Sequence, residues 1–369
     1  MIIIWLQEDY QVKLNEANFT FPTFVISLMF TLLILQACSS TKVYPRKKIT
    51  KTRLTSLVLT GYGSDSYEKS SVQTYLKELR ELGANTASFL YTCHVNNIND
   101  TDIDCDSFDS PRLDRLSYAI NLAKSQGFIV SLRVYVDILD ETWRCYWNPK
   151  DKKETFKNIK TMLSNFAKYS EEHKLELFIL GAEYCKLSRT PYTTQWQNII
   201  EEVRKHYQGK ITYGANWGEI DGIKEWKDVK FWKELDFIGI DHYQPVPYAF
   251  NEKQIVNYQK KNFLEYQKLA KKIGKPLLLA EIGFPGHKKG QLEPFEWRLK
   301  GETDEERQGM NFRATLKAVK SSSQFSGVLV WRKASTSPEL MLKYKKDALA
   351  YELYHRKAWY EIQHFFKSY

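Results

Sequence analysis

Hydrophobic positions from residue 54 onward come in short runs, and longer amphipathic segments separate one run from the next. The runs are rich in branched and aromatic residues and do not alternate strictly with polar ones, which is typical of strands covered on both faces. We expect eight strands, at 54–61, 86–91, 128–136, 175–181, 210–215, 236–241, 276–281 and 327–331.

The segments between the runs show helical spacing. In 71–83, Val72, Tyr75 and Leu79 fall on one face, and the segment ends at Gly83, a common helix stop. The same reasoning predicts helices at 113–127, 155–173, 194–209, 263–274 and 306–322.

Eight alternations of strand and helix predict an α/β fold with a parallel sheet and right-handed crossovers. A doubly wound sheet is the competing arrangement, but no glycine-rich phosphate-binding sequence follows any run. Length and count both fit a single (β/α)8 TIM barrel. We therefore predict one barrel domain over residues 54–369 and no interdomain linker.

The first 38 residues have a different character. Residues 24–37 are apolar and uncharged, a length nearer to a signal-peptide core than to a membrane span of about 20 residues. The sequence LLILQAC that ends there resembles a bacterial lipobox, which implies a lipid on Cys38 and a tether over 39–53. An uncleaved anchor helix is the alternative. Either reading places the barrel in the cell envelope of a bacterium, lipid-anchored to a membrane (periplasmic or surface-exposed), or secreted.

Four further cysteines are Cys93, Cys105, Cys145 and Cys185. In an oxidising compartment an even number allows disulfides, with three complete pairings, while ordinary buried thiols are the simpler expectation. Their spacing fits no common zinc motif, and no Asp/His cluster indicates a catalytic metal.

Charge and composition argue against a nucleic-acid-binding protein. The net charge of +10 comes from 54 basic residues scattered along the chain among 44 acidic ones. Without a zinc-finger spacing, an aromatic RNA-binding signature or a basic region joined to heptads, we expect a solvated surface and no nucleic-acid partner. The aromatic share of 14% suits either stacking on sugars or filling of the core.

Two of the expected strands end on a glutamate, Glu183 after the fourth and Glu281 at the end of the seventh. Catalytic groups of TIM barrels lie at the C-terminal ends of strands, and these two ends lie across the barrel mouth. Two carboxylates about 5–5.5 Å apart carry out retaining glycoside hydrolysis. One protonates the leaving oxygen and the other attacks the anomeric carbon. Tyr243 could donate a hydrogen bond that keeps the attacking carboxylate ionised.

The segments LFILGAEYCKL, WQNIIEEVRKHYQGKITYGANW, FWKELDFIGIDHYQPV and PLLLAEIGFPG, in this order, resemble glycoside hydrolase family 113, whose members are TIM-barrel β-mannanases. The resemblance covers most of residues 55–335. It implies that Glu183 is the acid/base and Glu281 the nucleophile. The wider clan usually carries Asn before the acid/base to bind the sugar 2-hydroxyl, but Ala182 stands here, as family 113 also lacks that Asn. Asn216 could bind this hydroxyl from another strand, or only cap the following turn.

Other side chains near strand ends are candidates for substrate binding. The resemblance implies that Trp331 floors the subsite beside the scissile bond, although a core Trp at the rim is the alternative. Trp143 and Trp147, in the loop after the third strand, could extend a cleft or only pack that loop. The remaining candidates for the pocket are Trp217, Tyr243, Asp241, Arg133 and His94.

These observations predict a retaining glycoside hydrolase that cleaves β-mannosidic or related β-glycosidic bonds of an oligo- or polysaccharide. We expect no cofactor, because carboxylates carry both the proton transfers and the covalent step. A non-catalytic glycan-binding lipoprotein on the same barrel is one alternative, since a fold does not imply activity. A cell-wall-active glycosidase is another. The presence of both glutamates favours an enzyme.

Overall fold

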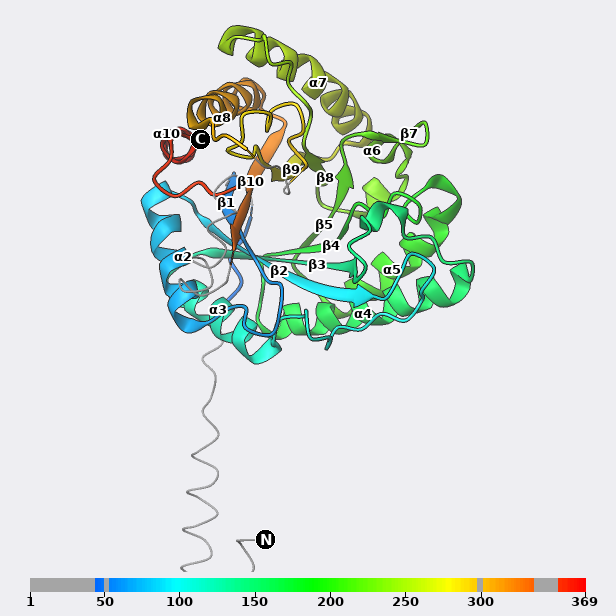
Figure 1. Ribbon diagram of the computed structural model, residues 1–369. Coiled ribbons are helices and arrows are strands. Elements are labelled where there is room, and N and C mark those ends of the chain that lie inside the picture. Colours follow the sequence, from blue (N-terminus) through cyan, green and yellow to red (C-terminus); the bar gives the residue numbers. More distant parts are fainter. Residues whose placement is uncertain (1–43, 50–52, 297–300, 335–350) are drawn as a thin grey trace, which may run out of the picture. The chain divides into compact units, whose positions relative to one another are not determined.

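Eight parallel strands close into a barrel in the computed structural model, which describes residues 44–49, 53–296, 301–334 and 351–369 (Figure 1). Val43–Tyr369 forms a compact unit by itself. The predicted signal segment, including Cys38, lies outside the described residues. No helix in the described part of the chain is both long enough and apolar enough to cross a membrane.

The strands follow the predicted runs closely. Around the barrel their order is β1-β10-β9-β8-β5-β4-β3-β2, and neighbouring strands pair in parallel. The prediction of a TIM barrel is therefore confirmed. The bounds are β1 (Leu54–Thr60), β2 (Thr86–Val95), β3 (Ile129–Ile138), β4 (Leu177–Ala182), β5 (Lys210–Asn216), β8 (Ile238–His242), β9 (Leu277–Ile282) and β10 (Phe325–Ala334).

Helices surround the barrel and return the chain from the end of one strand to the start of the next (Figure 1). Short elements fill some crossovers: a hairpin of β6 (Glu219–Ile220) and β7 (Ile223–Lys224), and the 3-10 turns η1 (Arg144–Tyr146), η2 (Thr190–Tyr192) and η3 (Phe231–Glu234). The α-helices are α2 (Lys69–Leu82), α3 (Leu113–Ser125), α4 (Lys152–Glu172), α5 (Thr193–His206), α6 (Glu225–Asp228), α7 (Glu252–Ile273), α8 (Glu305–Lys320) and α10 (Lys357–Ser368).

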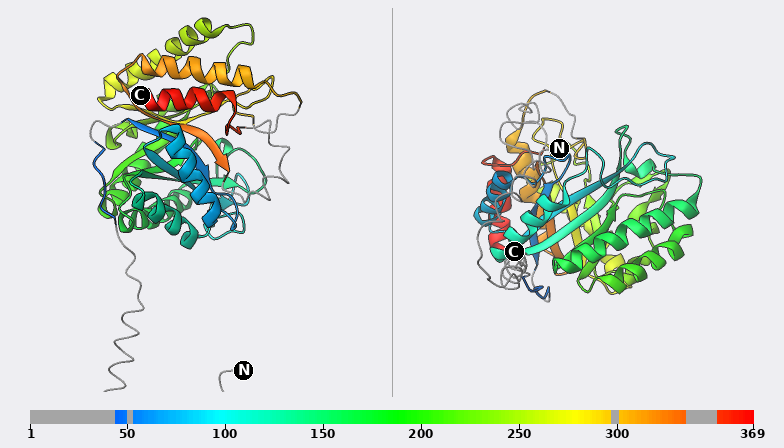
Figure 2. Two further views of the ribbon diagram at one scale, coloured as in Figure 1. Left: turned by 90° about the vertical axis from the view of Figure 1, so that its left-hand side faces the viewer. Right: turned by 90° about the horizontal axis from the view of Figure 1, so that it is seen from below.

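Three helices differ from the sequence prediction, and the short α6 is one that was not predicted. α7 starts at Glu252 rather than near 263, because Asn251 and Gln254 form a reciprocal capping box that begins the helix earlier. α10 was not predicted. Its apolar face, which includes Trp359 and Phe366, is buried, and the helix lies beside α8 (Figure 2). Its buried residues recur at helical spacing, a local signal that the sequence prediction did not use, and burial of this face against neighbouring helices stabilises the helix.

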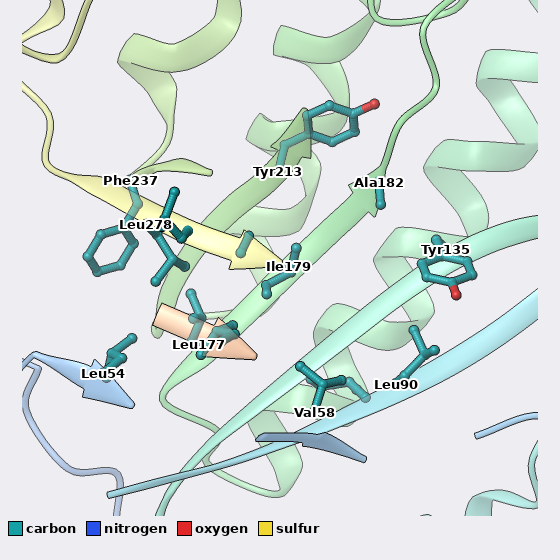
Figure 3. Close-up of a cluster of buried hydrophobic side chains, with 14 of the residues drawn as sticks. Leu54, Val58, Leu90, Tyr135, Leu177, Ile179, Ala182, Tyr213, Phe237 and Leu278 are labelled. Atoms are coloured by element: carbon teal, nitrogen blue, oxygen red, sulfur yellow. The ribbon is translucent and has the colours of Figure 1, made fainter. Parts of the chain in front are cut away.

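The core is continuous through the strands. Figure 3 shows buried side chains from several strands gathered in one cluster, among them Leu54, Leu177, Ile179 and Leu278. Each fully buried side chain of this size stabilises the fold by about 1.5–3 kcal/mol. The strands are consequently held as a rigid frame, which positions the residues at their ends.

All four described cysteines are in disulfides, so the expectation of free buried thiols is wrong. Cys93 pairs with Cys105, and Cys145 pairs with Cys185. The first bond joins β2 to the loop that follows it. The second joins the loop after β3 to the segment after β4, and therefore connects two neighbouring loops at the barrel mouth.

Candidate active site

Four neighbouring strands bring the polar residues of the site together. In the strand register Asn216 of β5 lies beside Asp241 of β8, and Asp241 lies beside Glu281 of β9. The backbone N–H of Glu183, directly after β4, donates to the carbonyl of Gly214 at 2.9 Å. Since all these strands are parallel, their ends deliver the four side chains to one edge of the barrel.

Glu183 is held by three donors. Its Oε1 accepts from Asn216 Nδ2 at 2.9 Å, and its Oε2 accepts from Trp143 Nε1 at 2.9 Å and Arg144 Nη1 at 3.0 Å. The residue has a φ of 55°, a left-handed conformation that costs roughly 1–3 kcal/mol outside glycine. Such strain persists where the surroundings determine the geometry, and it is common at functional sites.

Glu281 is held by residues from the barrel itself. Tyr243 Oη donates to its Oε2 at 2.7 Å, and Arg133 Nη1 donates to its Oε1. Arg133 reaches from β3 and also makes two bonds of 3.1 Å to the carboxylate of Asp241 and one of 2.7 Å to the carbonyl of Ala280. One buried guanidinium therefore links β3, β8 and β9.

Burial dominates the electrostatics of this cluster. It raises the pKa of Glu281 above its usual range, with a further increase from Asp241, while Arg133 and the hydrogen bond from Tyr243 act in the opposite direction. Burial also raises the pKa of Asp241 to about 6, again opposed by Arg133. The ionised form of Glu281 therefore depends on Arg133 and Tyr243, because water supplies little stabilisation at this depth.

Glu225 in α6 is a residue of the site that the sequence analysis missed. Its Oε1 accepts from Ser188 Oγ at 2.6 Å and Tyr213 Oη at 2.7 Å, and its Oε2 accepts from the N–H of Asn216 at 2.6 Å. Tyr213 Oη in turn accepts from the N–H of Tyr184. Glu225 thus holds the backbone of Tyr184, which directly follows Glu183, through Tyr213. It also holds the backbone of Asn216, whose side chain donates to Glu183. It follows no predicted strand, so no sequence signal could have identified it.

Arg144 is the second missed residue. Besides Glu183, its guanidinium bonds Asp137 at 3.1 Å and lies 3.9 Å over the ring of Tyr135. The adjacent Cys145 is in the disulfide to Cys185, two residues beyond Glu183. The loop that supplies Arg144 and Trp143 is therefore covalently joined to the segment that carries their acceptor.

Aromatic rings surround the two glutamates. The half-buried Trp331 and Trp217 pack against Tyr243 and Tyr351. Trp217 stacks on Phe295 with ring centroids 6.4 Å apart, and Phe295 is 52% exposed. These rings offer flat apolar faces at the mouth, which suits contact with sugar rings.

The remaining candidates lie elsewhere. Trp147 is completely buried, and its indole N–H donates to the carbonyl of Asp100, so it packs the loop. His94 is also buried and contacts Ser107 Oγ through Nδ1 at 2.8 Å. The described residues contain no group of three or more side chains that could hold a metal ion.

Comparison with known proteins identifies the family. The profile of Glycoside Hydrolase Family 113 matches residues 60–355. Among proteins with curated descriptions, none matches the chain.

Solved structures show the same fold. A GH113 β-1,4-mannanase in a complex superposes with a TM-score of 0.75 at 21% identity, over 86% of this chain and 100% of that one. The GH113 β-mannanase AaManA from Alicyclobacillus acidocaldarius gives 0.75 at 19% identity, over 87% of this chain and 99% of that one. A β-glucuronidase from an uncultured Clostridium species gives 0.59 at 14% identity, over 86% of this chain and 51% of that one.

The profile match covers most of the barrel, from the last residue of β1 to the turn before α10. It includes both glutamates and the residues that hold them. The chain therefore belongs to glycoside hydrolase family 113 and is a β-mannanase-like glycoside hydrolase.

Proposed function

We propose that this protein hydrolyses β-mannosidic bonds with retention of configuration, by a double displacement at Glu183 and Glu281. The observation that carries the proposal is the pair of buried glutamates at the ends of β4 and β9, each held by its own set of donors. Two of the similar structures are GH113 β-mannanases, which supports mannan as the substrate.

In the first step an ionised Glu281 oxygen attacks the anomeric carbon, and the bond from this carbon to the leaving oxygen breaks. Glu183 gives its proton to the leaving oxygen. In the second step Glu183 takes a proton from water, the hydroxide attacks the same carbon, and Glu281 leaves as a carboxylate. Arg133 and Tyr243 stabilise the charge of Glu281 before the attack and after its release.

Asn216 supports this geometry in the absence of substrate. Its Nδ2 donates to Glu183, and its Oδ1 accepts from the N–H of Gly218 at 2.7 Å. The second bond is the turn cap considered as an alternative role. A sugar 2-hydroxyl that binds the amide would replace the bond to Glu183, so one residue can serve both roles. In this proposal Trp331 is the floor beneath the sugar next to the scissile bond.

The test is hydrolysis of manno-oligosaccharides by the wild type, Glu183→Gln and Glu281→Gln, with the anomer of the product followed by NMR. We expect initial formation of the retained anomer by the wild type and loss of at least about a thousandfold in rate for each variant. Glu219→Gln, an exposed carboxylate in the neighbouring hairpin, is the matched control and should retain activity.

Equal rates in the wild type and the two variants would contradict the assignment of these glutamates, and inverted product would contradict the double displacement. Binding of glycans without cleavage of any β-linked glycan would instead support the non-catalytic alternative.

We also propose that Cys38 carries a lipid and anchors the enzyme in the bacterial cell envelope. The apolar segment 24–37 and the lipobox-like sequence before Cys38 support this. Incorporation of labelled palmitate into the wild type but not into Cys38→Ser, read by mass spectrometry of the N-terminal peptide, tests it. An unmodified N-terminal peptide that starts before residue 38 would contradict it.

A further inference from the structure

The barrel has two ends, and the one opposite the glutamates is strongly basic. We call it the basal face: the described residues at the starts of the barrel strands and at the ends of the helices that run back to them. Basic residues occupy the last turns of α2, α3, α5, α7, α8 and α10: Arg80, Lys124, Arg204, Lys205, His206, Lys271, Lys272, Lys317, Lys320 and Lys367. Helix dipoles alone favour this placement, so further evidence is needed to assign it a role.

A hollow in the basal face provides such evidence. Its volume is about 480 Å³, and its lining comes from the starts of β5, β8, β9 and β10 and from the segment before β1. Arg53, Lys210 and Lys275 line it together with the single carboxylate Asp236. The rest of the lining is two serines and four apolar residues: Ser323, Ser326, Ile49, Phe237, Pro276 and Phe325. Arg53 and Lys210 precede or begin strands rather than end helices, so the helix dipole does not explain these two cations, whereas Lys275 directly follows the C-cap of α7.

The acidic residues of this face are already engaged. Asp236 is paired with both Arg204 and Lys210, and Glu171 is paired with Arg46 and Lys174. Among the described residues, the ion pairs of α7 are made by residues before its last turn, for example Glu265 with Lys268. Lys271, Lys272 and Lys275 have no such partner there. Some cations at the helix ends are paired as well, Lys124 with Glu176, Lys205 with Glu202 and Lys317 with Glu252. The excess positive charge around the hollow therefore comes from Arg53, Lys271, Lys272 and Lys275.

The chain approaches the barrel at the same face. Arg46 Nε donates to the carbonyl of Leu175 at 2.7 Å and its Nη2 bonds Glu171, while the N–H of Lys47 donates to Glu176 at 2.8 Å. Leu175 and Glu176 immediately precede β4. Residue 44 lies six positions after Cys38, and six extended residues span at most about 20 Å. A lipid on Cys38 would therefore keep this face close to the membrane surface.

We propose that the basal face lies against a membrane surface of anionic phospholipids, so that the mouth with Glu183 and Glu281 faces away from the membrane. The closeness that the short tether imposes depends on the lipid proposed at Cys38, whereas the positive charge and the hollow are independent of that lipid. Anionic headgroups attract basic groups within a Debye length of the surface. A mouth directed outward is open to polymeric glycans, which the membrane would otherwise obstruct.

The test uses a chain that begins at residue 39, because the barrel forms a compact unit without the preceding segment. Co-sedimentation is measured with vesicles of phosphatidylcholine alone and of phosphatidylcholine mixed with phosphatidylglycerol. We expect binding to the mixed vesicles only, and weaker binding as salt is raised. The triple variant Lys271→Glu/Lys272→Glu/Lys275→Glu should bind on the order of a hundredfold more weakly, since each lysine near an anionic surface contributes about fivefold.

The matched control is Lys150→Glu/Lys153→Glu/Lys289→Glu, with the same change in charge. These three lysines are exposed, and they lie in the loops that follow β3 and β9 or at the start of α4, at the mouth end of the barrel. It should bind nearly as well as the wild type. A version with glutamine at the three basal positions guards against a folding defect, and hydrolytic activity of every variant reports an intact barrel.

Amide hydrogen exchange gives an independent readout of orientation. Mixed vesicles should protect the segments around 271–276 and 321–326 and leave the mouth loop 139–150 unprotected. The proposal would be overturned by equal binding of the basal and mouth variants, by binding that does not depend on phosphatidylglycerol, or by protection of the mouth loop. So would protection by inorganic phosphate without any vesicle binding, since this would identify a site for free anions only.

Discussion

At the mouth of the barrel, burial raises the pKa of Asp241 and Glu281, whereas at the base cationic partners lower the pKa of Glu171. Asp241 at the mouth is completely buried, and its pKa is raised to about 6 in spite of its two bonds to Arg133. Glu171 at the base is partly exposed. Although burial opposes the effect, Lys174, the N–H of Gln208 and Arg46 lower its pKa to about 2. The same residue types thus serve reactivity at one end and stability at the other.

The difference arises from the amount of water that remains. A carboxylate at the surface gains from each partner and loses little hydration, so its ionised form is favoured. A carboxylate inside the barrel loses nearly all hydration, and its partners recover only part of that loss.

Arg133→Gln should have the largest effect, because it leaves Asp241 and Glu281 without their shared cation. Removal of one partner of a buried ion pair typically costs about 3–5 kcal/mol of stability, and loss of the charge on Glu281, the proposed nucleophile, should abolish activity. Denaturant unfolding and hydrolysis of manno-oligosaccharides measure the two effects. Arg112→Gln, which removes an exposed pair with Asp114, is the control and should change neither. A small effect of Arg133→Gln would show that the mouth does not depend on this cation.

Tyr243→Phe removes one donor to Glu281 and leaves the ring in place. A hydrogen bond to a charged group is worth about 1.5–3 kcal/mol, so kcat should fall roughly 10- to 150-fold with little change in the unfolding midpoint. Tyr248→Phe, an exposed tyrosine after the same strand, should leave kcat unchanged. If Tyr243→Phe lowers stability and kcat equally, the hydroxyl is structural and not part of the charge balance at Glu281.

The two disulfides allow a comparison within the mouth. Loss of Cys145–Cys185 in a double serine variant should lower kcat by about tenfold, because it frees the loop that brings Trp143 and Arg144 to Glu183. The corresponding variant of Cys93–Cys105 removes a bond that holds no donor to either glutamate, and it should retain kcat. Activities are compared at a temperature where both variants remain folded by circular dichroism. Equal losses would show that neither disulfide positions the site specifically.

The smallest effects should appear in the dependence of stability on pH. Glu171 has a lowered pKa in the folded state, so it stabilises the fold above its ordinary value of 4.5 and loses this contribution as pH falls toward about 2. Asp241 has a raised pKa, so it favours the folded state at low pH, and this contribution is lost as pH rises from 3.8 to about 6.

Thermal unfolding across this range separates the two ends. Glu171→Gln should remove about 1 kcal/mol near neutral pH and flatten the acid side of the curve. Asp241→Asn should flatten the decline between about pH 4 and 6. If the dependence of thermal unfolding on pH were the same in both variants as in the wild type, the contrast between the carboxylates of the mouth and the base would be wrong.

The sequence by itself determined the barrel and the positions of the two glutamates along it. Each strand is a run of branched and aromatic residues buried on both sides, so its pattern is local and the alternation with helices can be counted. Glu183 and Glu281 could be identified because they follow such runs directly. Asn216, Asp241, Tyr243 and Trp331 could be named for the same reason, since parallel strands bring their ends to one edge.

Only the tertiary structure decided which side chains hold these glutamates. Arg133 reaches across the barrel interior to β8 and β9, and Arg144 and Glu225 come from a loop and a short helix that no periodicity predicts. The pairing of the cysteines and the basic hollow at the base likewise join segments far apart in the chain. Such contacts depend on distances set by the closed sheet, and a linear pattern carries no information about them.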